Sequence, residues 1–234
     1  MSIWSNISKL LESFVLGQTL SSLFKNLKTP PEKRIGFTIA AIGLSAKMAK
    51  ADGIVTTKEQ IAFKNIFSIP QNDEKHVEYI FNLAQRDIAG FDIYAKRISK
   101  MLKNKPKLLE NLIEGLLYIS MADGIFHPNE EIFINKVAKI FKISNHKLAV
   151  LKARHIPELQ KNPYLVLGIA QNTEFKDIKK QWQKLVQESH PDNLIAQGLP
   201  QEAINLATSR LIAINKAWEI INRKNGKVHH INSY

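Results

Sequence analysis

The stretch FKDIKKQWQKLVQESHPD, residues 175–192, decides how the C-terminal part of this 234-residue chain folds. Its apolar residues recur at intervals of three or four positions, which places them on one face of a helix. They are Phe175, Ile178, Trp182 and Leu185. A second stretch has the same spacing, at Ile204, Ala207, Leu211, Ile214, Trp218 and Ile221. Because the connection between them is short, the two helices are expected to pack antiparallel, with their apolar stripes in contact.

The tripeptide His190-Pro191-Asp192 lies in that connection, at the tip of the predicted helical hairpin. Pro191 fixes its own φ and disfavours helical geometry at His190, so the first helix is expected to end there. The second helix is expected to begin near Pro200, since proline suits a first helical turn. A polar loop with an imidazole and a carboxylate is well suited to contacting a partner. The alternative is a turn with no further role, because all three residue types are common in loops.

These residues resemble the J domain of DnaJ-type co-chaperones. The segment NPYLVLGI, residues 162–169, is similar to the first helix of that domain, and KKQWQKL, residues 179–185, to its basic second helix. The segment HPDNLIAQGLP, residues 190–200, resembles the DjlA subgroup, in which Gly-Leu-Pro follows the tripeptide. The resemblance implies that His190, Pro191 and Asp192 contact a DnaK-type chaperone and trigger hydrolysis of the ATP that this partner holds.

Four lysines of the 175–189 helix extend this predicted contact site. Lys176, Lys180 and Lys184 recur every four residues on the side away from the apolar stripe, with Lys179 at the edge. Such a ridge can steer an acidic partner towards the helix. The alternative is an ordinary solvated face, whose charge nearby acidic residues nearly cancel. The resemblance favours partner binding, because it places the family's contact helix here.

Two positions depart from the family pattern. Asn193 stands where a basic residue usually follows the tripeptide, and Gln183 where an arginine is common. Both departures remove positive charge from the expected contact face, which predicts weaker or more selective binding of the partner.

An internal repeat organises the middle of the chain. The segment MAKADGIV, residues 48–55, recurs 71 positions later as ISMADGIF, residues 119–126. Each copy predicts a helix that ends at Ala-Asp-Gly, a tight turn and a second helix. The first helices, about 32–51 and 106–122, are apolar on most sides and are expected at the centre of a bundle. Further helices are expected at about 72–87, 91–103 and 144–154.

The doubled Ala-Asp-Gly and the phrase SAKMAKADG, residues 45–53, resemble the TerB-like domain that DjlA-type co-chaperones of some bacteria carry before the J domain. The predicted fold is therefore all-α, a TerB-like helical bundle with an internal repeat plus a C-terminal J-domain helical hairpin. The predicted divisions are an amphipathic N-terminal segment at 1–30, the TerB-like domain at 31–155, the J domain at 160–226 and a tail at 227–234.

Four acidic residues of the repeat, Asp52, Glu59, Asp123 and Glu130, are candidate metal ligands. Carboxylate oxygens suit calcium or magnesium, but four residues alone do not fill a shell of six to eight oxygens. The preferred interpretation is that these side chains cap helix ends, where backbone N–H groups need acceptors. No metal and no other cofactor is therefore predicted.

Residues 1–28 carry an amphipathic pattern with Trp4 and Phe14 among its apolar residues. Charged residues interrupt it before it reaches the roughly 20 apolar residues of a spanning helix, and it lacks the features of a signal peptide. Peripheral contact with a membrane is one interpretation, and docking on the protein's own core or on a second copy is the other. The predicted location is the cytoplasm, either free or at the cytoplasmic face of the inner membrane.

The formal net charge of +12 permits nucleic acid, an anionic membrane or an acidic protein as partner. The basic runs at 96–107 and 136–154 lack stacking aromatics, so solvated helix faces are preferred and no nucleic-acid binding is expected. The chain has no cysteine and none of the common catalytic motifs, so it is not expected to be an enzyme. The predicted function is that of a co-chaperone for a DnaK-type chaperone and unfolded client proteins. The alternative is a membrane-associated stress or envelope-sensing module, in which the TerB-like domain binds metal or a partner.

Overall fold

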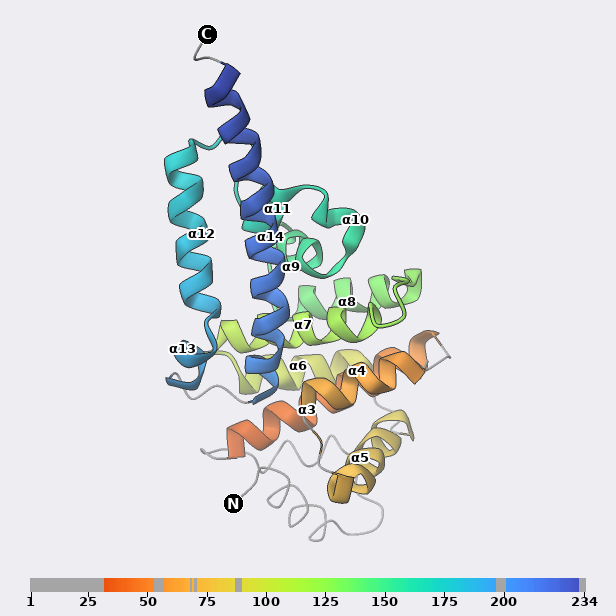
Figure 1. Cartoon of the computed structure of the whole chain (residues 1–234). Coiled ribbons are helices and arrows are strands. Elements are labelled where there is room, and N and C mark those ends of the chain that lie inside the picture. The colour runs from red at the N-terminus through yellow and green to blue at the C-terminus, as the bar shows by residue number, and fades with distance from the viewer. Residues whose placement is uncertain are drawn as a thin grey trace.

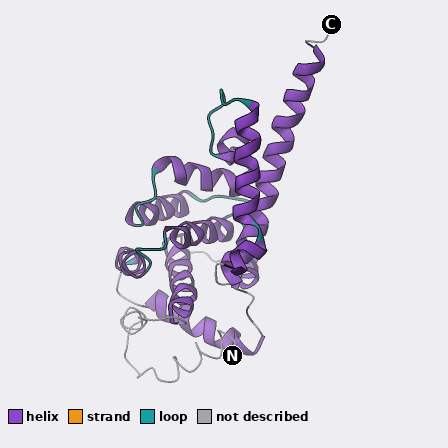
Figure 2. Ribbon diagram, turned by 90° about the vertical axis from the view of Figure 1, so that its left-hand side faces the viewer, coloured by secondary structure: helices purple, strands orange, loops and turns teal. Residues whose placement is uncertain are grey.

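The computed structural model describes residues 32–52, 57–67, 69, 71–86, 90–196 and 201–231. Within these residues every regular element is a helix, and no strand occurs (Figures 1 and 2). The predicted all-α class is confirmed. In the described part of the chain, no helix is both long and apolar enough to cross a membrane. The amphipathic segment at 1–28 lies outside the described residues.

The N-terminal bundle is built around α3 (Glu32–Asp52) and α7 (Pro106–Ser120). The other helices of the bundle pack around these two: α4 (Thr57–Phe67), α5 (Glu74–Arg86) after a 3-10 turn at Gln71–Asp73, α6 (Phe91–Met101) and α8 (Pro128–Ile140). Side chains such as Ile42, Ile113 and Leu117 are fully buried in the shared core. The prediction that the two most apolar helices occupy the centre is correct, because neither has a face polar enough to meet water.

The second copy of the repeat shows why its Ala-Asp-Gly turn ends one helix and starts the next. After α7, Asp123 accepts a hydrogen bond from the Ile125 N–H at 2.9 Å. Gly124 then adopts φ +91°, a left-handed conformation that favours glycine. The next helix, α8, begins at Pro128, and Glu130 accepts from the His127 N–H at 3.0 Å. The turn of the first copy, residues 53–56, lies outside the described residues.

Three short pieces connect the bundle to the C-terminal hairpin: α9 (Asn145–His155), α10 (Pro157–Gln160) and α11 (Pro163–Leu167). Ser144 starts α9 as predicted, since its Oγ accepts from the Lys147 N–H at 3.2 Å. Asn162 caps α11 in the same way. Gly168 ends α11 at φ +70° and lies against the side chain of Val150, which belongs to α9. The connection is therefore packed along its length.

The C-terminal hairpin consists of α12 (Phe175–Ser189) and α14 (Gln201–Ile231), which lie side by side in Figure 1. Their apolar stripes meet as predicted. The ring of Trp182 stacks on that of Trp218 at 4.8 Å between centroids, and Phe175 stacks on the same indole at 5.4 Å. Trp182 also donates from Nε1 to Asn215 Oδ1 at 3.0 Å, so its one polar atom is satisfied.

Three features of the hairpin were not predicted. The connection contains a short helix, α13 (Pro191–Ala196), so the tripeptide forms a helix start and not a simple loop. The last helix is helical to Ile231, past residue 226 where the J domain was predicted to end. The N-terminal half of α14 also packs against α4 and α7 of the bundle. The spacing of apolar residues in this helix did not predict that contact.

Candidate functional site

The tripeptide is held between the end of one helix and the start of another. His190 follows the last residue of α12 and has extended backbone angles, φ −67° and ψ 130°. Pro191 occupies the first position of α13, where its missing N–H costs no hydrogen bond. The Leu194 N–H donates to the His190 carbonyl at 3.2 Å and closes the first turn of α13. The backbone of the tripeptide is therefore fixed on both sides.

The two polar side chains of the tripeptide face water. The side chain of His190 is 53% exposed and that of Asp192 is 85% exposed. Nδ1 of His190 lies 3.7 Å from Asp192 Oδ2 and accepts a hydrogen bond from the Asp192 N–H at 3.3 Å. In the neutral imidazole this bond assigns the proton to Nε2. The site thus offers one N–H donor and one carboxylate to a partner.

Buried neighbours support this exposed corner. Ser189 and Leu194 flank the tripeptide and are both almost inaccessible to water. Asn193, the residue that departs from the family pattern, donates from Nδ2 to the Gln187 carbonyl at 2.6 Å. It therefore adds a second hydrogen bond to a carbonyl at the end of α12, which also accepts from the His190 N–H at 3.3 Å.

The four predicted lysines lie on the open face of α12. Lys176, Lys179, Lys180 and Lys184 are all exposed, and Ile178 on the opposite face is buried. Lys180 is 3.5 Å from Asp177, in an exposed pair whose contribution to stability is small. The lysines and the tripeptide belong to the same helix and its immediate continuation.

The candidate metal ligands do not form a described cluster. Asp123 and Glu130 accept the turn and helix-start hydrogen bonds given above, and Asp123 also lies 3.8 Å from His127. Glu59 is buried in α4, and the side chain of Asp52 lies outside the described residues. Among the residues whose side chains are described, no group of three or more His, Asp or Glu residues could hold a metal ion.

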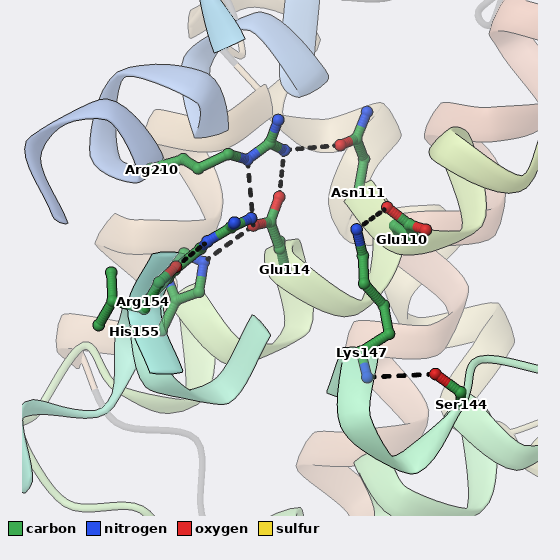
Figure 3. Close-up of polar contacts among 9 residues, drawn as sticks. Glu110, Asn111, Glu114, Ser144, Lys147, Arg154, His155 and Arg210 are labelled. Atoms are coloured by element: carbon green, nitrogen blue, oxygen red, sulfur yellow. Dashed lines mark hydrogen bonds and ion pairs between the residues drawn. The ribbon is translucent and has the colours of Figure 1, made fainter. Parts of the chain in front are cut away.

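Sequence reasoning missed a buried polar cluster that joins the bundle to the hairpin (Figure 3). Arg210 of α14 binds the carboxylate of Glu114 on α7 with two nitrogens: Nε lies 3.1 Å from Oε1, and Nη2 contacts Oε2. Nη2 also donates to Asn111 Oδ1 at 2.7 Å. Arg154 of α9 lies 3.9 Å from the same carboxylate and donates to the carbonyl of Val166 on α11 at 3.2 Å. Side chains of α7, α9 and α14 therefore meet at Glu114.

Electrostatics in the cluster favour the ionised carboxylate. Burial by itself raises the pKa of Glu114, but Arg210, with His155 and Arg154, outweighs burial and holds that pKa well below its usual value of 4.5. Burial lowers the pKa of Arg154, and the charge of Glu114 opposes this effect. The side chain of Glu114 is only 1% exposed, so the carboxylate depends on these cations for stabilisation.

A second contact beside the cluster brings α14 into the core of the bundle. Leu206 is buried among the core residues of α4 and α7, next to Gly115. Asn205 donates from Nδ2 to the carbonyls of Asn65 and Ile66 at the end of α4, at 3.2 and 2.7 Å. The hairpin is thus docked on the bundle by apolar and polar contacts.

The fold and the exposed tripeptide define a helical protein with two parts, and comparison with family models identifies both. Residues 38–153 match the family described as Tellurite resistance protein TerB, and residues 162–230 match the DnaJ domain. The chain therefore carries a TerB domain followed by a C-terminal DnaJ domain. This is the DjlA-like arrangement that the sequence motifs predicted.

Several curated relatives of this chain are named Co-chaperone protein DjlA. The one from Vibrio cholerae serotype O1 is 25% identical over 228 residues, covering 83% of this chain and 80% of the relative. The one from Aliivibrio fischeri is also 25% identical over 228 residues, with 83% and 81% covered. The one from Escherichia coli K12 is 28% identical over 142 residues, about half of each chain. No solved structure gives a significant match.

Proposed function

We propose that this protein is a co-chaperone that stimulates ATP hydrolysis by a DnaK-type chaperone through His190, Pro191 and Asp192. The observation that carries this proposal is the fixed backbone of the tripeptide combined with its exposed side chains. Exposed polar side chains on a loop that a rigid scaffold holds in place are common in binding sites. The DjlA relatives and the DnaJ match support the same function.

The proposed partner contact extends along α12. His190 presents an N–H donor, Asp192 accepts charge-assisted hydrogen bonds from a partner's arginine or lysine, and the four lysines attract an acidic surface. Exposed lysines mainly raise the association rate, and salt screens their effect over about 8 Å at physiological ionic strength. In this proposal the ATP-hydrolysing residues belong to the partner chaperone, and unfolded client proteins are further partners.

The test is stimulation of the ATPase of a DnaK-type chaperone by the full chain and by its His190→Gln variant. His190 is exposed, so glutamine in its place leaves the fold intact, and stimulation is expected to disappear. The matched control is His146→Gln, which changes another exposed histidine, at the start of α9. Full stimulation by the His190→Gln variant, with unchanged helical circular dichroism, refutes the proposal.

The lysine ridge has a separate test. Replacing Lys180 and Lys184 with glutamine is expected to lower the association rate with the chaperone and to flatten its dependence on salt concentration. The control replaces Lys136 and Lys139 on the exposed face of α8. Equal association rates for the two double variants contradict a role for the ridge.

We also propose that the protein works in the cytoplasm and that residues 1–28 make peripheral contact with the inner membrane. Support for this proposal comes from the amphipathic pattern of the segment, with Trp4 and Phe14 among its apolar residues. Liposome flotation of the full chain and of a variant without residues 1–28 tests it. Flotation that does not depend on this segment contradicts the membrane contact and leaves the co-chaperone proposal unaffected.

A further inference from the structure

A basic groove lies between the TerB and DnaJ domains, away from the tripeptide. It has a volume of about 520 Å³ and is lined by residues of α4, α7, α9 and α14. Pockets of this size, placed at domain interfaces, are common binding sites for small molecules. The charge and polarity of the residues that line the groove indicate which class of molecule it suits.

The charged side chains of the groove are cationic. Lys58 of α4, Lys216 of α14 and Arg154 of α9 line it, and none of the described lining residues carries a carboxylate. Lys58 and Lys216 are exposed and approach from different domains. Neither lysine has a carboxylate partner among the described side chains, whereas Lys64 and Lys152 pair with Glu74 and Glu131. An anion in the groove would meet positive charge from both sides.

The buried cluster beneath the groove adds to this positive charge. Arg154 and Arg210 share the carboxylate of Glu114, so two guanidinium groups face one carboxylate within the described contacts. His155 also lines the groove, and its Nε2 is buried without a hydrogen-bond partner in the described structure, 3.8 Å from Glu114. Arg154 and His155 therefore bring a guanidinium group, and an imidazole nitrogen without a hydrogen-bond partner among the described atoms, to the wall of the groove.

The remaining walls are apolar. Ile61 of α4 is 53% exposed and Ile212 of α14 is 65% exposed, and both line the groove together with Met121. Exposed isoleucines on facing helices of two domains are suited to contact with an apolar group. The groove thus combines two lysines at its margin with an apolar surface, which fits a molecule with one anionic end and one hydrocarbon end.

We propose that this groove binds a small organic anion with an apolar chain, a medium-chain carboxylate or an alkyl phosphate. The anionic group contacts Lys58 and Lys216, and the chain lies against Ile61 and Ile212. Because the groove includes α4 and α7 of the TerB domain and α14 of the DnaJ domain, the bound molecule strengthens the docking of the two domains. This site does not depend on the co-chaperone proposal.

The test is isothermal titration calorimetry of the full chain with octanoate and with octyl phosphate, at constant ionic strength. Saturable binding of at least one of them is expected, and the comparison tells which anionic group is preferred. Octanamide has the same chain without the charge, and acetate and inorganic phosphate have the charge without the chain. Each of these three is expected to bind at least about tenfold more weakly, a difference of about 1.4 kcal/mol.

Variants locate the binding site. Replacing both Lys58 and Lys216 with glutamine is expected to weaken binding at least about tenfold. The control replaces Lys100 and Lys103, which are exposed and do not line the groove, and is expected to leave the affinity unchanged. The Ile212→Ser variant is expected to weaken the binding of octanoate more than the binding of acetate. Absence of binding by both probes, or equal affinity in the two lysine double variants, overturns the proposal.

Discussion

Replacing Glu114 with glutamine should be among the most destabilising conservative changes in this chain. Glutamine keeps the size of the side chain and removes its charge, so Arg210 and Arg154 lose the carboxylate that they share. The side chains of these arginines are 11% and 6% exposed, which prevents water from replacing the lost charge. Leaving buried charge without its partner costs about 3–5 kcal/mol.

That cost predicts a large shift in thermal unfolding. For a chain of this size each kcal/mol lowers the Tm by about 2–4 °C, so a decrease of about 6–20 °C is expected. Urea denaturation at neutral pH, followed by far-UV circular dichroism, measures the same change as a free energy of unfolding. The cluster joins two domains, so both should lose stability in the variant.

A control variant lies one turn earlier on the same helix. Glu110 pairs with Lys147 at 3.0 Å, but both side chains are partly exposed. The Glu110→Gln variant should therefore lose only about 0–1 kcal/mol. If Glu114→Gln is no less stable than Glu110→Gln, the buried cluster does not hold the domains together as the geometry indicates.

Four further outcomes are expected. Because the pKa of Glu114 is lower in the folded than in the unfolded chain, the free energy of unfolding should decrease as pH falls below about 4.5. In urea denaturation measured across this pH range, the Glu114→Gln variant should lose less stability than the unmodified chain. Leu206→Ala should cost about 2–5 kcal/mol in the same assay, whereas the exposed Ile212→Ala should cost almost nothing. Gly115→Ala should raise the stability by about 0.5–1 kcal/mol, since its Cβ would meet Leu206 at an ordinary 3.5 Å; a lower Tm would contradict this. Asn193→Lys should lose about 0.5–1.5 kcal/mol with its bond to Gln187 yet bind the chaperone faster at low salt, as stopped-flow association would show.

Helical periodicity was sufficient to predict the hairpin. The stripe through Phe175 and Trp182 faces Trp218, as the spacing of apolar residues requires. The helix predicted from residue 144 begins there, because the Ser144 hydroxyl accepts from the Lys147 N–H. Local rules of this kind describe contacts within a few residues or between neighbouring helices.

The buried cluster required information that local rules do not contain. Arg210 and Glu114 are 96 residues apart, and periodicity alone does not state which helices meet. One signal was present: Asn111 and Glu114 are polar residues in a segment otherwise apolar on most sides, and buried polar groups need partners. Leu206 was missed because α14 has two apolar faces, one for each domain, and spacing revealed only the face towards α12.

The tripeptide was located correctly at the tip, but its local conformation was not predicted. Pro191 was recognised as the end of one helix, and it is also the first residue of another. Proline is favoured at that first position for the same reason that it is excluded from helix interiors, its lack of an N–H. A proline after an extended residue is found both in loops and at the first position of a helix. Here the hydrogen bond from the Leu194 N–H to the His190 carbonyl shows that a helix begins.

The sharing of α14 between the two domains has a consequence for the design of chimeric proteins. A graft that exchanges the DnaJ domain at its first residue would bring in a foreign last helix, without Asn205, Leu206 or Arg210. Such a chimera would carry its tripeptide on a domain that lacks these contacts with the TerB domain. A successful exchange therefore needs those three side chains transplanted onto the incoming helix.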